Sequence, residues 1–234
     1  MFFDLRTQLP DKAAFLSDVN AELVNCYEAV RDDVHGVIRA LRGHVYESDH
    51  YYEVRALKPA DLPPAERAAR TIFLNKTGYN GLYRVNRSGQ FNVPFGRMTK
   101  PLFCDVENLQ ACSRALAGVS ITHGDFAEAT KRAKKGDFVY FDPPYVPLSP
   151  TSDFTAYIPG GFGEAEQRKL AKVFAKLADR GVHVMLSNSD TPLVRELYAD
   201  FEINVVYASR SVNSNAARRG KLAEVVVCNR TGRS

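Results

Sequence analysis

Short apolar runs recur along the chain, and in its second half they alternate with stretches of helical spacing. Runs of this length and composition are typical of buried strands. They lie at residues 13–18, 119–122, 137–141, 182–186, 203–207 and 223–228. Alternation of strands and helices predicts a doubly wound α/β sheet. The last two runs have no clear helical pattern between them, so we expect an antiparallel hairpin at one edge of the sheet.

Apolar residues at three-to-four-residue spacing predict two helices in the first half of the chain. The first is a long helix from about Leu23 to Leu41, with Asn20 near its start as a cap. The second covers residues 64–76, and its pattern leaves Arg67 and Arg70 on the outer side. Both helices therefore present one apolar face to a core.

Two further helices are predicted in the second half. The first runs over residues 164–180 and ends at Gly181. The second is a short helix with Pro192 in its first turn, for which Asp190 is the expected cap. Residues 78–97, by contrast, are rich in glycine and asparagine and have little helical period, so they predict a hairpin or an ordered loop.

Composition narrows the class of protein only a little. The 234 residues are 45% hydrophobic and 25% charged, as expected for one globular domain with or without an insertion. The net charge of +4 is compatible with a polyanionic partner but does not require one. The four cysteines have no spacing typical of a metal site or a disulfide framework. With neither an apolar run of about 18 residues nor a signal peptide in the sequence, we expect a cytoplasmic protein with no metal and no membrane partner.

The strongest candidate for chemistry is the tetrapeptide Asp142-Pro143-Pro144-Tyr145, directly after an apolar strand. Ligands of open α/β sheets bind at such strand ends. One reaction that would suit these residues is group transfer to the amino nitrogen of adenine. That nitrogen is a poor nucleophile because its lone pair is delocalised into the ring. Acceptance of its hydrogens by the Asp142 carboxylate and the Pro143 carbonyl would free that lone pair, and Tyr145 offers a ring on which a flipped base can stack. A turn without function is the simpler alternative for these residue types.

Other segments resemble the Dam-type DNA adenine methyltransferases and occur in that family's order. The resemblance rests on Asn75-Lys76-Thr77-Gly78-Tyr79-Asn80-Gly81-Leu82-Tyr83-Arg84, Gln90-Phe91-Asn92-Val93-Pro94-Phe95-Gly96, Phe154-Thr155-Ala156-Tyr157 and Ser187-Asn188, together with the tetrapeptide. It covers nearly the whole chain, and the combination of motifs is far more specific than any one of them.

The resemblance implies an α/β fold: a Rossmann-like S-adenosylmethionine-dependent methyltransferase sheet, mostly parallel, with an antiparallel edge hairpin. Residues 1–20 and 105–234 would form the catalytic domain. Residues 21–104 would form an inserted helical DNA-recognition domain that carries a β-hairpin. The implied activity is transfer of a methyl group from S-adenosyl-L-methionine to a flipped adenine in double-stranded DNA. We expect a monomer in a bacterial or phage-infected cell.

The resemblance also implies roles for individual residues. Asp18 would bind the ribose hydroxyls of the cofactor, Asp125 and Phe126 would hold its adenine, and Asp142 would lie against both cofactor and substrate. The expected DNA-binding residues are Tyr79, Asn80, Leu82, Arg84, Pro94, Arg97, Arg210 and Arg218. Arg84 would read a guanine edge, and Leu82 and Pro94 would contact a thymine methyl, which predicts the target GATC.

The amino terminus departs from the family pattern. Family members carry a glycine-rich cofactor turn ahead of the position of Asp18, whereas this chain starts with Met1-Phe2-Phe3, which matches only the tail of that motif. We therefore expect weakened cofactor binding. This leaves open a catalytically inactive, DNA-binding fragment as the alternative function. A methyltransferase acting on amino groups of RNA or protein is a further alternative, disfavoured by the recognition segment. A role in restriction-modification would require a partner nuclease.

Overall fold

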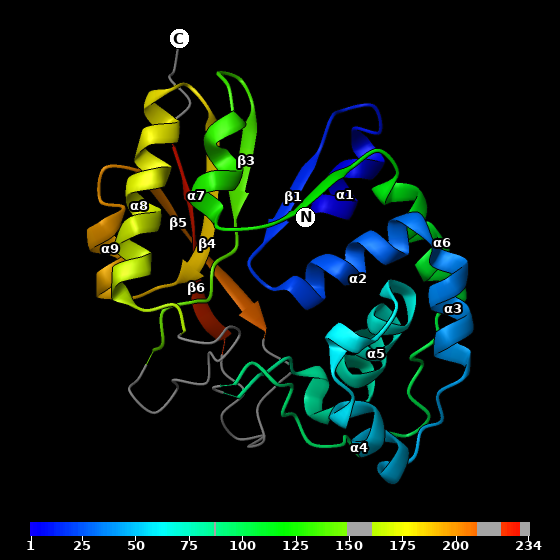
Figure 1. The fold of residues 1–234 in the computed structure, drawn as a ribbon. Coiled ribbons are helices and arrows are strands. Elements are labelled where there is room, and N and C mark those ends of the chain that lie inside the picture. The colour runs from blue at the N-terminus through cyan, green and yellow to red at the C-terminus, as the bar shows by residue number, and fades with distance from the viewer. Residues whose placement is uncertain (87, 149–160, 210–220, 230–234) are drawn as a thin grey trace. The chain divides into compact units, whose positions relative to one another are not determined.

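The computed structural model describes residues 1–86, 88–148, 161–209 and 221–229 (Figure 1). The chain forms two compact units, Met1–Phe126 and Ala127–Ser234, which are described in turn. Each unit contains its own sheet, so the α/β class expected from the alternation is confirmed. The six predicted strands form two separate sheets, one of two strands and one of four.

The first unit is a small parallel sheet with helices packed against it. Its helices and strands are α1 (Phe2–Gln8), β1 (Phe15–Asp18), α2 (Ala21–Asp32), α3 (Val34–Arg42), α4 (Ser48–Ala56), α5 (Pro64–Thr77), α6 (Val106–Leu116) and β2 (Ser120–His123). Short 3-10 turns cover Pro59–Asp61 and Tyr79–Gly81. β1 and β2 pair in parallel, with Asp18 opposite His123. Because the two strands are parallel, their carboxyl ends lie at the same edge of the sheet.

The prediction of one long helix from Leu23 to Leu41 is wrong in one respect, because the helix is interrupted at Asp33. Asp33 has φ −143°, outside helical geometry, and its carboxylate accepts a hydrogen bond from the backbone N–H of Gly36 at 2.9 Å. A side chain that caps a new helix competes with continuation of the old one. The apolar stripe persists through the break, and Val37 and Leu41 are fully buried.

Arg70 is a second correction, because it is buried rather than on the outer side of α5. Only 5% of it is exposed, and it donates hydrogen bonds to the carbonyl oxygens of Val54 and Arg55 at 3.0 and 2.9 Å. These bonds fasten the end of α4 to α5. Burial lowers the pKa of the Arg70 guanidinium below its usual range.

Residues 78–86 and 88–97 pair as an antiparallel loop, in agreement with the hairpin or loop expected there. Isolated bridges pair Gly78 with Phe95 and Val85 with Phe91. Gly96 lies so close to the backbone of α5 that a Cβ would approach the Gly78 carbonyl oxygen to 2.8 Å. Glycine is therefore required where the loop returns to the helix.

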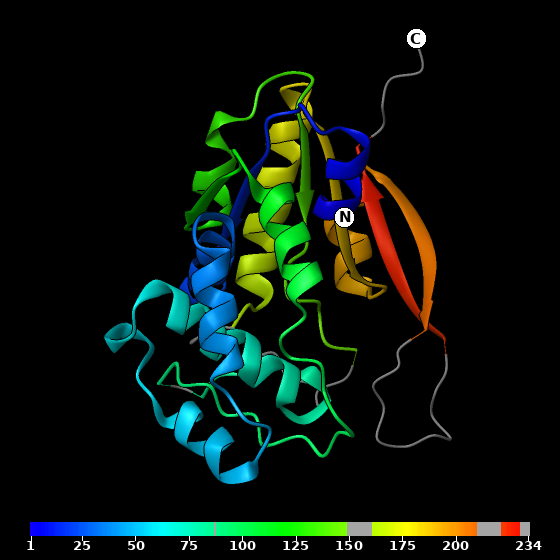
Figure 2. The same ribbon diagram turned by 90° about the vertical axis from the view of Figure 1, so that its right-hand side faces the viewer.

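The second unit contains a four-stranded mixed sheet. Its elements are α7 (Phe126–Ala129), a 3-10 turn at Thr130–Arg132, β3 (Phe138–Phe141), α8 (Glu164–Asp179), β4 (His183–Ser189), α9 (Pro192–Leu197), β5 (Glu202–Ser209) and β6 (Lys221–Cys228). The strand order is β3-β4-β6-β5. β3 and β4 are parallel, whereas β6 is antiparallel to both of its neighbours. The expected edge hairpin is confirmed, and Figure 2 shows its two strands side by side.

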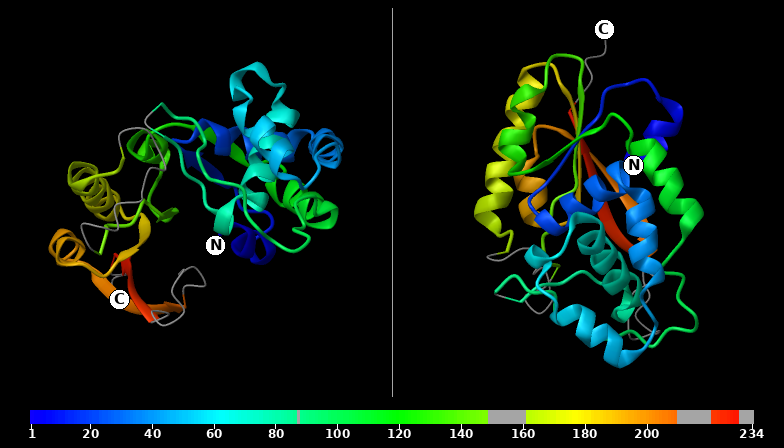
Figure 3. Two further views of the ribbon diagram at one scale, coloured as in Figure 1. Left: turned by 90° about the horizontal axis from the view of Figure 1, so that it is seen from below. Right: turned by 45° about the vertical axis from the view of Figure 1, so that its right-hand side comes forward.

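Helices α8 and α9 lie on one face of this sheet (Figure 3). Leu170, Phe174 and Leu177 of α8 are almost fully buried, as are Leu186 of β4 and Val227 of β6. The short helix begins as expected at Pro192, but Thr191 caps it, with its hydroxyl accepting from the Val194 N–H at 3.3 Å. Asp190, the predicted cap, instead pairs with Arg195 at 2.6 Å. No helix in the described part of the chain has the length and apolar content to cross a membrane.

Candidate functional site

The tetrapeptide 142–145 lies at the carboxyl end of β3, as expected. The Asp142 carboxylate reaches solvent, yet the surrounding protein raises its pKa, first by partial burial and second through the negative charge of Glu224 on β6. Among the described residues, nothing donates a hydrogen bond to the Pro143 carbonyl. Two acceptors therefore stand next to each other at this strand end.

A chain of buried amide groups fixes the backbone of the tetrapeptide. The side-chain amide of Gln167 in α8 donates to the Pro144 carbonyl at 2.9 Å. Asn188, at the end of β4, donates to the Gln167 side-chain oxygen at 3.1 Å and accepts from the Val146 N–H at 2.9 Å. Gln167 is 1% exposed and Asn188 is fully buried. Because buried amides are costly to leave unpaired, these bonds hold residues 144–146 in one conformation.

The opposite face of the sheet carries phenol groups beside Asp142. The Tyr140 hydroxyl lies 2.8 Å from the Ser187 hydroxyl, and Tyr145 follows Asp142 in the tetrapeptide. Burial raises the pKa of Tyr145 to about 12 and raises that of Tyr140, and the charge of Asp142 adds to both shifts. Both phenols therefore remain neutral at neutral pH.

Asp18 ends β1 in the first unit, at the carboxyl end of a parallel strand pair. One of its carboxylate oxygens accepts from the Asn20 N–H at 2.7 Å, and its carbonyl accepts from Gly124 at 3.0 Å. Asp125 and Phe126 follow β2 at the same edge and are partly exposed. The structure thus brings together the two carboxylates that were predicted to bind the cofactor, and such acceptors suit ribose hydroxyls and an adenine amino group.

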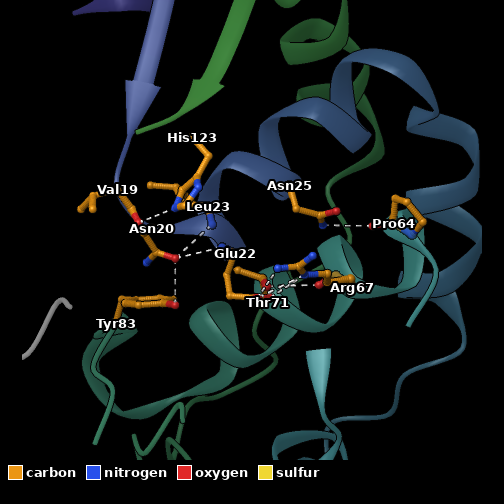
Figure 4. Close-up of polar contacts among 10 residues, drawn as sticks. All are labelled: Val19, Asn20, Glu22, Leu23, Asn25, Pro64, Arg67, Thr71, Tyr83 and His123. Atoms are coloured by element: carbon orange, nitrogen blue, oxygen red, sulfur yellow. Dashed lines mark hydrogen bonds and ion pairs between the residues drawn. The ribbon is translucent and has the colours of Figure 1, made fainter. Parts of the chain in front are cut away.

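Figure 4 shows how this strand end connects to α5 and to the loop. Asn20 caps α2 by accepting from Glu22 and Leu23, and its side-chain oxygen also receives the Tyr83 hydroxyl at 3.4 Å. Glu22 and Arg67 form an ion pair at 2.5 Å. A residue of the loop at 78–97 therefore contacts the cap of α2, two residues after Asp18.

Six of the predicted DNA-binding residues belong to this loop: Tyr79, Asn80, Leu82, Arg84, Pro94 and Arg97. Tyr79 and Leu82 are 44% and 42% exposed, and Pro94 is also exposed. The Tyr79 N–H donates to the Pro94 carbonyl at 2.9 Å, which joins the two halves of the segment. Asn80 has φ 55°, a left-handed conformation that asparagine tolerates better than most residues.

Arg84 belongs to the same loop, where Asn92 holds its guanidinium. Nε donates to the Asn92 side-chain oxygen at 2.8 Å, and Nη2 donates to its carbonyl at 3.1 Å. Arg84 must exchange these bonds to grip a base edge with its fork. Arg97, the last residue of the loop, is exposed. Arg210 and Arg218 lie outside the described residues, as do Phe154-Thr155-Ala156-Tyr157.

Behind the loop, a cavity of about 530 Å³ opens between α4, α5 and residues 83–92. Four cationic side chains line it: Arg55, Lys58, Arg67 and Arg70. Glu22 is the one carboxylate among its lining residues and already pairs with Arg67. This side of the first unit therefore presents an excess of positive charge.

The sequence interpretation missed Gln167 and Glu224. Gln167 was detectable, because it occupies a position in the apolar stripe of α8 with Leu170 and Phe174, where a polar residue needs a partner. Glu224 had no comparable signal, since its place beside Asp142 depends on strand order. No cluster of three potential metal ligands occurs in the described ranges.

Comparison with known proteins agrees with these motifs. Residues 1–212 match the family described as D12 class N6 adenine-specific DNA methyltransferase. The chain is 41% identical to a Type II methyltransferase of Lactococcus lactis subsp. cremoris, over 98% of this chain and 82% of that protein. It is 40% identical to a Type II methyltransferase of Methanocaldococcus jannaschii, over 94% and 80%. It is 35% identical to the DNA adenine methylase of Escherichia coli K12, over 93% and 79%.

The family match identifies the class of reaction. Enzymes of this class act on the N6 amino group of adenine in DNA, and the family implies S-adenosylmethionine as the methyl donor. With a family match over residues 1–212 and relatives that are 35–41% identical over more than nine-tenths of its length, the chain belongs to the D12 class of N6 adenine-specific DNA methyltransferases.

Proposed function

We propose that this enzyme methylates an adenine flipped out of double-stranded DNA within the sequence GATC. The observation that carries the proposal is the loop of residues 78–97, on which an exposed aromatic ring, an arginine fork and apolar contacts lie together. The surrounding residues 21–104 would form the recognition domain, and residues 1–20 with 105–234 the catalytic domain. The Type II names of two relatives support a role in restriction-modification.

The loop residues supply the chemistry that base recognition needs. The Tyr79 ring is large, flat and exposed, as required of a side chain that enters a base stack in place of a flipped adenine. Asn80 would contact the vacated position. The Arg84 fork matches the O6 and N7 acceptors of guanine, whereas Leu82 and Pro94 offer apolar contact to a thymine methyl.

Arg97 is proposed to contact phosphate, as are Arg210 and Arg218. Such contacts add affinity that falls with salt and carry no sequence information. Replacing one of these arginines should therefore weaken binding to all sequences, whereas replacing Arg84 should reduce discrimination between sequences. A phosphate-contacting arginine can thus serve as the control for Arg84.

Asp18, Asp125 and Phe126 would hold S-adenosylmethionine, with Asp142 against its methyl group. The cofactor supplies an electrophilic methyl group on sulfur. Asp142 and the Pro143 carbonyl accept the two amino hydrogens of adenine, which favours a pyramidal nitrogen whose lone pair faces the methyl. Tyr145 offers its ring to the flipped base. The bonds from Gln167 and Asn188 keep these acceptors in place before substrate arrives.

The test uses the chain with tritium-labelled cofactor and a duplex oligonucleotide containing one GATC site. Single-base variants of the site measure specificity, and 2-aminopurine at the target adenine reports flipping by its fluorescence. We expect transfer to GATC, reduced about 5–150-fold by each replaced base, as follows from 1–3 kcal/mol per mismatch. Equal transfer to all variants would contradict the GATC assignment. Binding to GATC without any transfer would favour the inactive DNA-binding alternative.

Arg84→Lys and Arg97→Ala separate base reading from phosphate contact. Arg84→Lys keeps the charge but loses the fork, so discrimination at the guanine should fall by about 1–3 kcal/mol. Arg97→Ala should weaken binding to all sequences alike and reduce the salt dependence. Unchanged guanine discrimination in Arg84→Lys would remove Arg84 from base recognition.

A further inference from the structure

Glu224 lies on the same face of the second unit's sheet as the groups around Asp142. Residues directly opposite each other on paired strands share a face. Tyr140 is paired with Met185 and Ser189 with Glu224, and Ser187, paired with Val226, lies between them in β4. The alternate positions Val184, Leu186 and Asn188 are buried on the other face. Glu224, Ser187 and Tyr140 therefore belong to the face opposite Asn188.

The geometry places the Glu224 and Asp142 side chains across a single strand from each other. Asp142 follows Phe141, which is in register with Leu186, so it lies level with Ser187 at the end of β3. Glu224 lies two residues from Val226, the partner of Ser187 in β6. Two strand spacings separate the backbones of β3 and β6 by about 10 Å. The intervening residues are the small Ser187 and Ser189, which leave room for the two carboxylates to approach.

We propose that Glu224 is a positioning residue for methyl transfer, because its negative charge makes Asp142 the stronger acceptor for a proton of the substrate's amino group. The proposal rests on the function proposed above and adds a residue to it. Among the described residues of the second unit, Glu224 is the one charged side chain found among the groups acting on Asp142. Tyr140 and Tyr145 face it as neutral phenols.

Methyl transfer creates the proton that Asp142 must accept. The sulfur–methyl bond of the cofactor breaks and leaves its electron pair on sulfur, while the lone pair of N6 forms the nitrogen–methyl bond. The nitrogen then carries a positive charge and two hydrogens. Asp142 takes one of these protons, which leaves neutral N6-methyladenine, and passes it to water. A nearby carboxylate raises the proton affinity of Asp142 and so favours this step.

The direct test is a titration of Asp142 that does not depend on catalysis. The chain is labelled with carbon-13 at the aspartate side-chain carboxyl, and Asp142→Asn identifies the resonance. We expect the midpoint of Asp142 to move to lower pH in Glu224→Gln and to stay near that of the wild type in Glu224→Asp. Glu202→Gln is the matched control, because Glu202 lies on the same face at the far end of the hairpin, opposite Cys228. An unmoved midpoint in Glu224→Gln overturns the proposal.

Kinetics with the GATC duplex provide the second readout. Glu224→Gln should lower kcat about tenfold with little change in KM, which is less than the roughly 10²–10⁴-fold contributed by a general base, because Asp142 itself is kept. The acid limb of its pH profile should move to lower pH, whereas Glu202→Gln leaves the profile unchanged. An unchanged kcat overturns the proposal. If the wild type transfers no methyl group, the proposed function fails, and the titration still decides the effect of Glu224 on Asp142.

Discussion

Among single residues, buried polar groups differ in whether the fold provides a partner for them. Asn20, Gln167 and Asn188 are buried and hydrogen-bonded, and each holds a piece of backbone next to a functional residue. Tyr198 is fully buried, and its hydroxyl has no partner among the described residues. The first group serves the site, whereas the Tyr198 hydroxyl costs stability.

Tyr198→Phe should stabilise the protein by roughly 1 kcal/mol, because it removes a buried hydroxyl without a partner and keeps the ring against Phe174. Urea unfolding followed by circular dichroism measures the change. Tyr51→Phe is the matched control, since the buried Tyr51 hydroxyl donates to the Val93 carbonyl at 3.0 Å and its loss should destabilise. Destabilisation by Tyr198→Phe would show that its hydroxyl has a partner.

His44 should make the protein less stable in mild acid. Burial and the neighbouring His50 lower the pKa of His44 to about 4, from an ordinary value near 6.5. As the pH falls from 6.5 to 4, the unfolded chain takes up a proton that the folded chain refuses, so the free energy of unfolding decreases. We expect a loss on the order of 2 kcal/mol, allowing for partial exposure.

Denaturant unfolding at several pH values tests this prediction. His44→Phe keeps an aromatic ring stacked on Phe73 and should flatten the pH dependence between 6.5 and 4. His35→Asn, at an exposed position of α3, is the control and should leave the dependence as in the wild type. An equally steep acid loss in His44→Phe would assign the effect to other groups.

At the scale of helices and strands, periodicity predicted the strands and the two strongly amphipathic helices well, but it did not reveal every helix or the break within one of them. All six apolar runs form strands, and α5 and α8 appear within one residue of their expected limits. The break between α2 and α3 was not expected, because the apolar stripe continues through it and only the capping geometry of Asp33 marks it. α4 and α6 were missed altogether.

The amide chain from α8 to the tetrapeptide predicts a coupled loss of stability and activity. Gln167→Leu leaves Asn188 and the Pro144 carbonyl without a buried partner, which should cost about 1–3 kcal/mol of unfolding free energy. Displacement of the acceptors should lower kcat by roughly tenfold or more. Lys172→Leu, at an exposed position of α8, is the control and should change neither. Wild-type kcat in a folded Gln167→Leu protein would contradict the positioning role.

For the whole molecule, the sequence was sufficient to predict the family and the α/β class. It was not sufficient to predict how the strands are divided between two sheets. Strand pairing joins segments far apart in the chain, and periodicity carries no information about which strand lies beside which. For the same reason Asp142 and Asp18 could be identified from motifs, whereas Glu224 could not. The predicted recognition domain at residues 21–104 stays a prediction.

The strand order also governs when the second unit can fold on the ribosome. β6 follows all the other strands in sequence, yet it lies between β4 and β5. Until it is synthesised, β5 has no neighbour and β4 presents an open edge, which is a state prone to mispairing. The sheet that carries Asp142 therefore closes after translation of residues 221–228. A nascent chain stalled before residue 221 should remain sensitive to protease throughout this unit.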